Sequence, residues 1–187
     1  MTKVESCLEY ANSINLDEVE SLRLLWENTH IRQDPQQFGN FRFVSGREIF
    51  HNTLYHGHGR YPGQKGDCGI YWTTSYGKVL GMTSFNIHAE EDFLKIVQIQ
   101  GTRAEYLSKI EKSALKMLPW EMSLISLVEN IGTEKGFSSV KMISPNDIPS
   151  IHSGKMNPKK TTRKYKISAL QRGFFPSEDN DEWYKPL

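Results

Sequence analysis

Cysteine is scarce in this 187-residue chain, which has two, Cys7 and Cys68. The two form no CxxC pair, and no cluster of histidine and cysteine stands near either of them. A structural zinc site takes about four such ligands, and a small secreted scaffold needs several cysteine pairs. The sequence therefore argues against a zinc module and a disulfide framework, and we expect no bound metal.

The chain also lacks an excess of charge of either sign and any long apolar run. A net charge of +1 gives no long-range attraction to nucleic acid or to an anionic membrane. No apolar stretch approaches the roughly 18 residues that cross a bilayer. The first residues, MTKVESCLEYANS, lack the apolar core of a signal peptide. These absences predict a soluble, cytoplasmic protein, and the length suits one domain.

Two amphipathic helices are predicted in residues 1–40. Thr2 and Glu5 have the spacing of a capping box, and Asn15 with Glu18 repeats that start signal. The apolar residues at helical spacing are Val4, Cys7, Leu8 and Ala11 in the first helix and Val19, Leu22, Leu25 and Trp26 in the second.

Strands are predicted in residues 41–101. Phe41 and Phe43 alternate with polar neighbours, which indicates a strand. Residues 57–69 hold five glycines and form a loop. Residues 69–74 and 79–88 then predict a hairpin that turns at 75–77, and residues 93–100 predict a further strand. We expect this region to be mostly antiparallel.

The second half alternates helices with strands. Apolar spacing from Ala104 to Leu118 predicts one helix, and Pro119 suits the first turn of the next. A strand at 138–144 and a helix at 161–172, ended by Gly173, follow. Two short strands are predicted at 174–175 and 183–184. The fold class expected is α/β, with a central mixed sheet flanked by helices.

The order from residue 93 onward resembles the acyl-CoA-binding half of the GNAT superfamily of N-acyltransferases. The segments that carry the resemblance are FLKIVQIQG, WEMSLISLVENIGTEKGFSSVKMIS, YKISALQRGFF and EWYKPL. The resemblance implies one GNAT-like domain over residues 1–187, with its cofactor half at 102–187. It also implies that a central strand leaves its neighbour, so that main-chain amides hold the pantetheine arm of acetyl-CoA or another acyl-CoA. The next helix would receive the pyrophosphate at its N-terminus.

The family's phosphate loop reads Gln/Arg-x-x-Gly-x-Gly/Ala, and the resemblance places it here at the end of a strand. The predicted cofactor-binding residues are Gln98, Gln100, Gly101, Thr102 and Arg103. The chain departs from the pattern because Arg103 stands in the last position and an additional helix follows. The alternative for these residues is an ordinary strand end and turn.

Three residues are predicted to be catalytic: His56, His88 and Tyr165. Transfer to an amine needs a base for the amine proton and an acid for the leaving thiolate. Histidine titrates near neutral pH, so His56 and His88 are the candidate bases, with Glu90, Glu91 and Asp92 as alternatives. Ala169 stands where the family's tyrosine acid lies, and Tyr165 is one turn further back.

Two other functions stay open from the sequence. The first is a non-catalytic protein of the same fold, which would bind a protein or nucleic-acid partner through the basic residues of 155–166. The second is an ADP-ribosyltransferase-like enzyme that consumes NAD, because the Gly-rich segment resembles that family's NAD-binding motifs at His56 and Tyr71. The non-functional alternatives are a solvated face for the basic residues and an exposed loop for the Gly-rich segment.

Overall fold

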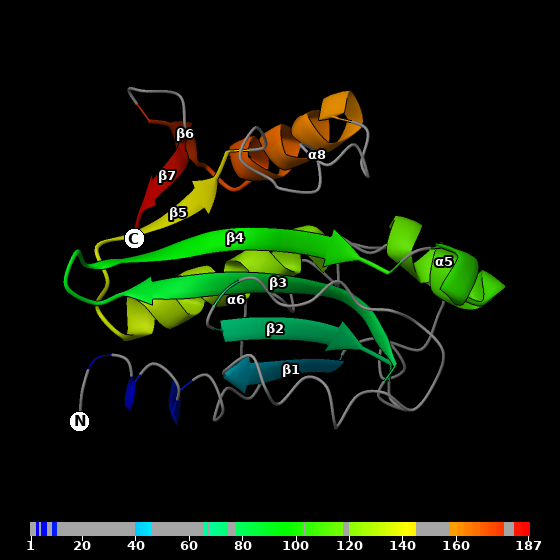
Figure 1. Cartoon of the computed structure of the whole chain (residues 1–187), viewed down its shortest axis with the longest axis horizontal. Coiled ribbons are helices and arrows are strands. Elements are labelled where there is room, and N and C mark those ends of the chain that lie inside the picture. Colours follow the sequence, from blue (N-terminus) through cyan, green and yellow to red (C-terminus); the bar gives the residue numbers. More distant parts are fainter. Residues whose placement is uncertain are drawn as a thin grey trace.

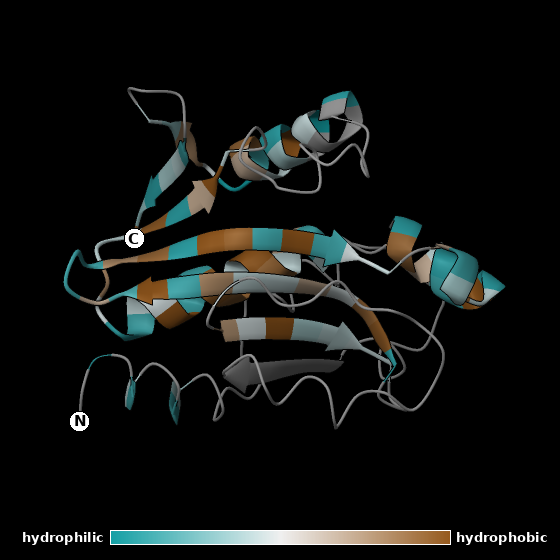
Figure 2. Ribbon diagram, viewed as in Figure 1, coloured by the Kyte–Doolittle hydropathy of each residue, from teal (hydrophilic) through white to brown (hydrophobic). Residues whose placement is uncertain are grey.

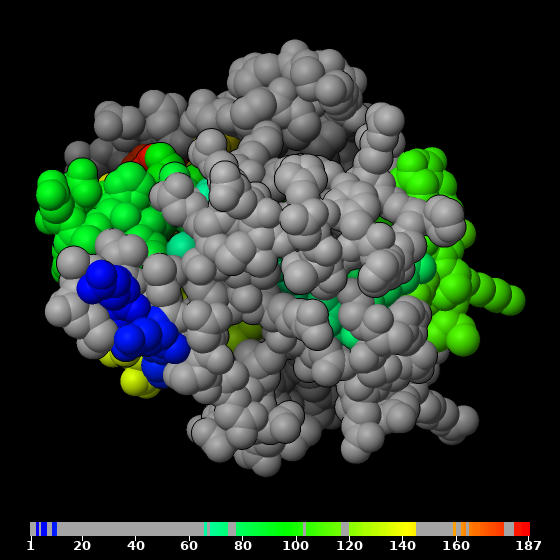
Figure 3. All heavy atoms as spheres, turned by 60° about the horizontal axis from the view of Figure 1, so that its bottom comes forward, coloured from blue at the N-terminus to red at the C-terminus, as the bar shows by residue number. Residues whose placement is uncertain are grey.

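The computed structural model describes residues 3, 5–6, 9–10, 40–45, 66, 68–74, 78–102, 104–117, 120–144, 158–177 and 182–187. Lys3, Glu5, Ser6, Glu9 and Tyr10 are helical, as predicted for the first helix. The second predicted N-terminal helix lies outside the described residues. Lys3 Nζ donates to the carboxylate of Asp92, in the turn after residue 88, and at 3.0 Å to the carbonyl of Gly136. Figure 3 shows these N-terminal residues in blue at the surface.

The described strands form one seven-stranded sheet in the order β1-β2-β3-β4-β5-β7-β6 (Figure 1). The strands are β1 (Asn40–Ser45), β2 (Cys68–Thr73), β3 (Val79–His88), β4 (Phe93–Gly101), β5 (Ser139–Ile143), β6 (Phe175–Pro176) and β7 (Glu182–Pro186). Every neighbouring pair is antiparallel except β4 and β5, which run parallel. The predicted mixed sheet is therefore confirmed, with an antiparallel meander joined to a smaller antiparallel unit.

Helices connect and cover these strands. They are the 3-10 helix η2 (Ala104–Tyr106) and the α-helices α5 (Lys109–Met117), α6 (Trp120–Glu134) and α8 (Pro158–Gln171). Helix α6 forms the crossover between β4 and β5 and contacts β2, β3, β4 and β5. Its buried side chains and the apolar residues of β3 and β4 make the core, which Figure 2 shows as brown bands on both layers. None of the described helices combines the length and apolar composition that a membrane crossing requires.

Glycine follows both long helices, as predicted for Gly173. Gly136 and Gly173 have φ of 65° and 76°, a left-handed conformation that costs a glycine little. After Gly173, the Phe174 N–H donates to the Ala169 carbonyl at 3.0 Å, which pairs one of the last carbonyls of α8. The chain can then turn directly into β6.

The single helix predicted from Ala104 to Leu118 is instead broken at Ser108. The Ser108 Oγ accepts the Glu111 N–H at 3.2 Å, and the Glu111 carboxylate accepts the Ser108 N–H at 2.7 Å. This reciprocal pair is a capping box, which satisfies two otherwise unpaired donors and starts a new helix at Lys109. Residues 104–106 therefore form a separate short turn of 3-10 helix.

Replacing Ser108 with alanine is expected to lower the free energy of unfolding by about 1 kcal/mol, because α5 then loses its N-cap. Urea denaturation followed by circular dichroism measures the change. Ser108→Asp is the matched control, since aspartate caps as well as serine and should keep most of the stability. Equal losses in both variants would show that the capping bond contributes little.

Candidate functional site

Strand β4 is paired with β5 over its first four residues only. The last parallel pair is Ile96 with Met142, although β4 continues to Gly101. At the same point the register against β3 shifts: Phe85 pairs with Ile96 and Ser84 with Gln98, so Val97 is an extra residue. Such a β-bulge bends its strand and increases the local twist. The second half of β4 therefore stays on β3 while it leaves β5 (Figure 1). We call this edge of β4, residues 97–101, which does not pair with β5, the opening.

The bulge also changes which residues of β4 face α6. A Cβ on Gly132 of α6 would lie 3.4 Å from the Leu94 side chain, and a Cβ on Gly101 would lie 3.1 Å from the Trp120 ring. Positions 94 and 101 therefore both face α6, although seven residues in a regular strand would put them on opposite faces. The extra residue at Val97 explains this, because it shifts the alternation of side chains by one position.

The main chain of Ile99 points into the opening rather than toward β3. The Thr102 N–H donates to the Leu80 carbonyl of β3 at 2.8 Å. In an antiparallel ladder, alternate residues direct their main-chain groups to the same side. Gln100 and Thr102 thus point toward β3, and Ile99 and Gly101 point away from it. This edge of β4 presents donors and acceptors where β5 has already ended its pairing.

Tyr165 of α8 reaches this edge. Its hydroxyl accepts the Ile99 N–H at 2.8 Å and donates to the Ile99 carbonyl at 3.0 Å. The residue is 7% exposed. Burial raises the pKa of the Tyr165 hydroxyl to about 12, and the hydrogen bond from the Ile99 N–H opposes this only in part. Tyr165 therefore keeps its proton at neutral pH, and that proton is directed at a carbonyl oxygen.

Gln98 and Gln100 lie on the other face of β4 in a chain of polar contacts. The Gly66 N–H donates to Ser84 Oγ at 3.2 Å, and that hydroxyl donates to Gln98 Oε1 at 3.3 Å. Gln98 Nε2 then donates to Gln100 Oε1 at 3.0 Å. The Gln98 side chain is buried. These side chains orient one another across β3 and β4.

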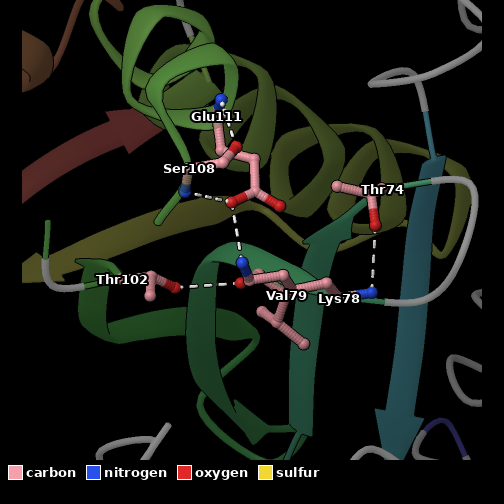
Figure 4. A network of polar contacts seen from close by, with 6 residues as sticks. All are labelled: Thr74, Lys78, Val79, Thr102, Ser108 and Glu111. Carbon is pink, nitrogen blue, oxygen red and sulfur yellow. Dashed lines mark hydrogen bonds and ion pairs between the residues drawn. The ribbon is translucent and has the colours of Figure 1, made fainter. Parts of the chain in front are cut away.

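Thr102 is turned toward β3. Its hydroxyl donates to the Val79 carbonyl at 2.9 Å (Figure 4). In the same view, Lys78 Nζ lies 2.7 Å from Glu111 Oε2, which ties the start of β3 to the capping box of α5. The hydroxyl and N–H of Thr102 therefore both bind the main chain of β3. Arg103, the last predicted cofactor residue, lies outside the described residues.

Trp120, the first residue of α6, covers Gly101. Gly101 is paired with Gly81 across β3 and β4, and Gly81 is paired with Trp72 across β2 and β3. A Cβ on Gly81 would lie 2.7 Å from the Trp120 ring, which also stacks on Trp72 with centroids 6.0 Å apart. The two glycines thus form a flat slot for the indole. The first turn of α6 also carries Glu121, whose charge opposes an anion at a helix N-terminus.

Of the three predicted catalytic residues, the structure describes His88 and Tyr165, and it places them at different ends of β4. His88 is the last residue of β3, paired with Phe93 at the far end of β4 and stacked on its ring with centroids 4.4 Å apart. Six residues of strand separate position 93 from position 99, which is about 20 Å. Of the alternatives beside His88, Asp92 is bound by Lys3 and Ser138. His56 lies outside the described residues, and Tyr165 is the predicted catalytic residue found at the opening.

Two features of the site escaped sequence reasoning, and one of them left a signal. The residues of β4 that face α6 are Leu94, Ile96, Ile99 and Gly101, so the spacing is two, then three, then two. That break in alternation marks the bulge. The slot for Trp120 had no comparable signal, because it joins residues from β2, β3, β4 and α6.

Comparison with known proteins finds likenesses in structure. No protein-family model matches the chain, and no curated protein matches it. An acetyltransferase from Bacillus cereus ATCC 14579 is similar over 94% of this chain and 95% of its own, with a TM-score of 0.40 and 13% identity. A GNAT-family acetyltransferase from Listeria monocytogenes 4b F2365 is similar over 64% of each chain, with a TM-score of 0.40 and 12% identity.

A third similar structure is YhbS from Escherichia coli, a GNAT-family N-acetyltransferase in complex with CoA. It matches 64% of this chain and 58% of its own, with a TM-score of 0.36 and 13% identity. The fold of the present chain rests on its own strand order, its one parallel pair and the separation after Ile96. The described residues form an α/β fold with a mixed sheet, as predicted.

Proposed function

We propose that this chain binds an acyl-CoA in the opening beside β4 and transfers the acyl group to an amine. The observation that carries the proposal is the end of β4–β5 pairing at Ile96, while β4 runs on to Gly101. The main-chain groups of Ile99 and Gly101 are then directed into the opening, about 7 Å apart along the strand. A linear ligand that carries amides at a similar spacing, such as a pantetheine arm, suits this edge.

The transfer would proceed by direct attack. The amine nitrogen forms a bond to the thioester carbonyl carbon, the carbonyl oxygen becomes an oxyanion, and the C–S bond then breaks. A main-chain N–H of β4 is a fixed donor for that oxyanion, and such donors stabilise charge as it develops. The leaving thiolate takes a proton from Tyr165, which remains protonated at neutral pH. The amine proton goes to a base. His88 lies beside Phe93, about 20 Å along β4 from Ile99, which leaves His56 as the predicted residue for this role.

A second candidate is a binding protein that has kept the fold without the transfer reaction. The observations that favour it concern the residues at which the resemblance places the phosphate loop and the following helix. Trp120 covers Gly101, Thr102 is bound to β3 and Glu121 occupies the first turn of α6. Its binding surface would be the basic face of α8. Lys159, Arg163 and Lys166 are exposed there at helical spacing. The partner would be an acidic protein or a nucleic acid.

The NAD-consuming alternative has less support. Tyr71, which the resemblance to ADP-ribosyltransferases would stack on nicotinamide, is 0% exposed in β2. A stacked ligand needs an exposed ring face, and the buried Tyr71 side chain offers none. The other residue of that resemblance, His56, lies outside the described residues.

Titration with acetyl-CoA tests the leading proposal. A ligand present at 100 times its Kd stabilises the folded state by about 2.7 kcal/mol. For a chain of this size we expect the melting temperature to rise by roughly 5–10 °C. Calorimetry should show matching heat, and a thiol reagent should detect free CoA when an amine acceptor is added. Adenosine 3′,5′-bisphosphate, which lacks the pantetheine arm, is the control and should bind more weakly.

The result that counts against acyl-CoA is the absence of heat and of any thermal shift with acetyl-CoA and longer acyl-CoAs. If the chain instead binds RNA or DNA with a steep dependence on salt, the basic face of α8 is the functional surface. Neutralising Lys159, Arg163 and Lys166 together would then abolish that binding.

A further inference from the structure

We propose that Tyr165 is a latch on the cofactor site: its hydroxyl holds the main-chain groups of Ile99 that an acyl-CoA would use. The cofactor would bind by displacing the tyrosine. This inference rests on the proposed function and concerns the regulation of the same site. It predicts that loss of the hydroxyl strengthens cofactor binding while it weakens transfer.

The hydroxyl substitutes for a strand at the edge of β4. A buried N–H or C=O group without a partner costs about 1–3 kcal/mol, so an edge that leaves its neighbouring strand needs other partners. One hydroxyl supplies both, since Tyr165 Oη accepts the Ile99 N–H and donates to the Ile99 carbonyl. An extended amide ligand presents a carbonyl and an N–H to a strand edge in the same way. Tyr165 and such a ligand therefore compete for the same two atoms.

Helix α8 is anchored so that this contact can be released without unfolding the helix. The C-terminal half of α8 is fixed by Ala169 in the core, by Phe174 just after the helix and by the ion pair of Arg172 with Glu129. Toward the N-terminus, the described side chains before Tyr165 are exposed or half-buried. Tyr165 is thus the first buried side chain of α8 in the described part of the helix. Its release frees the first turns, while the anchors after it stay in place.

The predicted gain in affinity follows from the hydrogen bonds that Ile99 keeps in the free and in the bound protein. In the free Tyr165→Phe variant, the Ile99 N–H and C=O lose their partner, which raises the free energy of the ligand-free protein. In the bound state the ligand pairs with these groups, so the variant and the wild type differ little. The gap between free and bound states is therefore larger in the variant. If Tyr165 only supported the fold, removal of its hydroxyl would not strengthen ligand binding.

The test compares wild type, Tyr165→Phe and Tyr10→Phe by calorimetry with CoA. Tyr10 is the matched control, because its hydroxyl also accepts a hydrogen bond, from Asn130 Nδ2 at 3.1 Å, away from the opening. We expect Tyr165→Phe to lower the Kd for CoA by about tenfold and Tyr10→Phe to leave it unchanged. With acetyl-CoA and an amine acceptor, Tyr165→Phe should lower KM for the thioester and lower kcat. An unchanged or raised Kd in Tyr165→Phe overturns the latch and leaves the proposed function standing.

Amide hydrogen exchange at Ile99 supplies a readout that does not depend on catalysis. In wild type we expect the Ile99 N–H to be protected both without and with CoA, because one partner replaces the other. In Tyr165→Phe the same proton should exchange at least tenfold faster without CoA and become protected when CoA is added. Equal exchange in the ligand-free variant and wild type would overturn the latch. Absence of CoA binding to all three proteins would overturn the proposed function together with the latch.

Discussion

Replacing Trp120 with alanine is expected to lower the free energy of unfolding by about 3–5 kcal/mol. The indole is 2% exposed, fills the slot over Gly81 and Gly101, and stacks on Trp72. Truncation removes a large buried apolar surface and leaves a cavity beside rigid backbone, which cannot collapse into it. Chemical denaturation should show a lower midpoint with an unchanged slope.

Two variants test whether the slot itself is the cause. Gly81→Ala should destabilise the protein by about 1–3 kcal/mol, because a methyl group at 2.7 Å from a rigid ring forces the indole or the strand to move. Trp120→Phe removes the part of the ring that meets that methyl group. The double variant should therefore lose less stability than the sum of the two single losses. Strict additivity, or a loss below about 1 kcal/mol in Trp120→Ala, would show that the slot is not tightly packed.

The stability difference between wild type and Tyr165→Phe should shrink by roughly 2–3 kcal/mol between pH 8 and pH 12. The pKa of Tyr165 is raised to about 12 in the folded chain from an ordinary value of 10.0, because burial disfavours the charged phenolate. A raised folded pKa means that the folded state holds the proton more tightly than the unfolded state. The stabilising contribution is therefore complete below pH 10 and is lost as the pH rises through 12. Each pKa unit corresponds to about 1.4 kcal/mol.

This prediction needs the variant as its reference, because other tyrosines and lysines titrate in the same range. Those groups are shared by the two proteins and cancel in the difference. The measurement is the free energy of unfolding in urea at several values of pH for both proteins. A stability difference that stays constant up to pH 12 would mean that the Tyr165 hydroxyl is not buried on β4 as described.

Local sequence patterns predicted most of the described elements, because local physics determines them. Strand β3 lies at Val79–His88, the predicted range, because its residues are β-favouring and turn signals flank them. Gly173 ends α8 because a left-handed residue at that point is cheap only for glycine. The break at Ser108 is also local, since Ser108 and Glu111 have capping-box spacing, and this signal overrides the apolar periodicity that predicts one continuous helix.

The site was less predictable because it depends on contacts between distant residues. Tyr165 and Ile99 are 66 positions apart, and nothing in either segment indicates a hydroxyl bridge between them. The same holds for Gly101, whose position in a loop pattern indicated contact with phosphate, whereas its packing against Trp120 requires the position of α6. The family resemblance predicted a site at the end of β4, and only the three-dimensional register identified which main-chain atoms face away from β3.

The short parallel ladder between β4 and β5 has a consequence for the order of folding. Strands β1–β4 form a meander that pairs only neighbours in the chain, and β5, β7 and β6 pair among themselves. Contacts close in sequence form early because they cost little loop entropy. The β4–β5 pairs join residues 46 positions apart and the β5–β7 pairs join residues 39–47 positions apart, so we expect both ladders to form after the hairpins of β2–β4. Weakening the β4–β5 pairing would then speed unfolding more than it slows refolding. The β1–β4 part of the sheet and the β5–β7–β6 part would separate along the line on which the proposed cofactor lies.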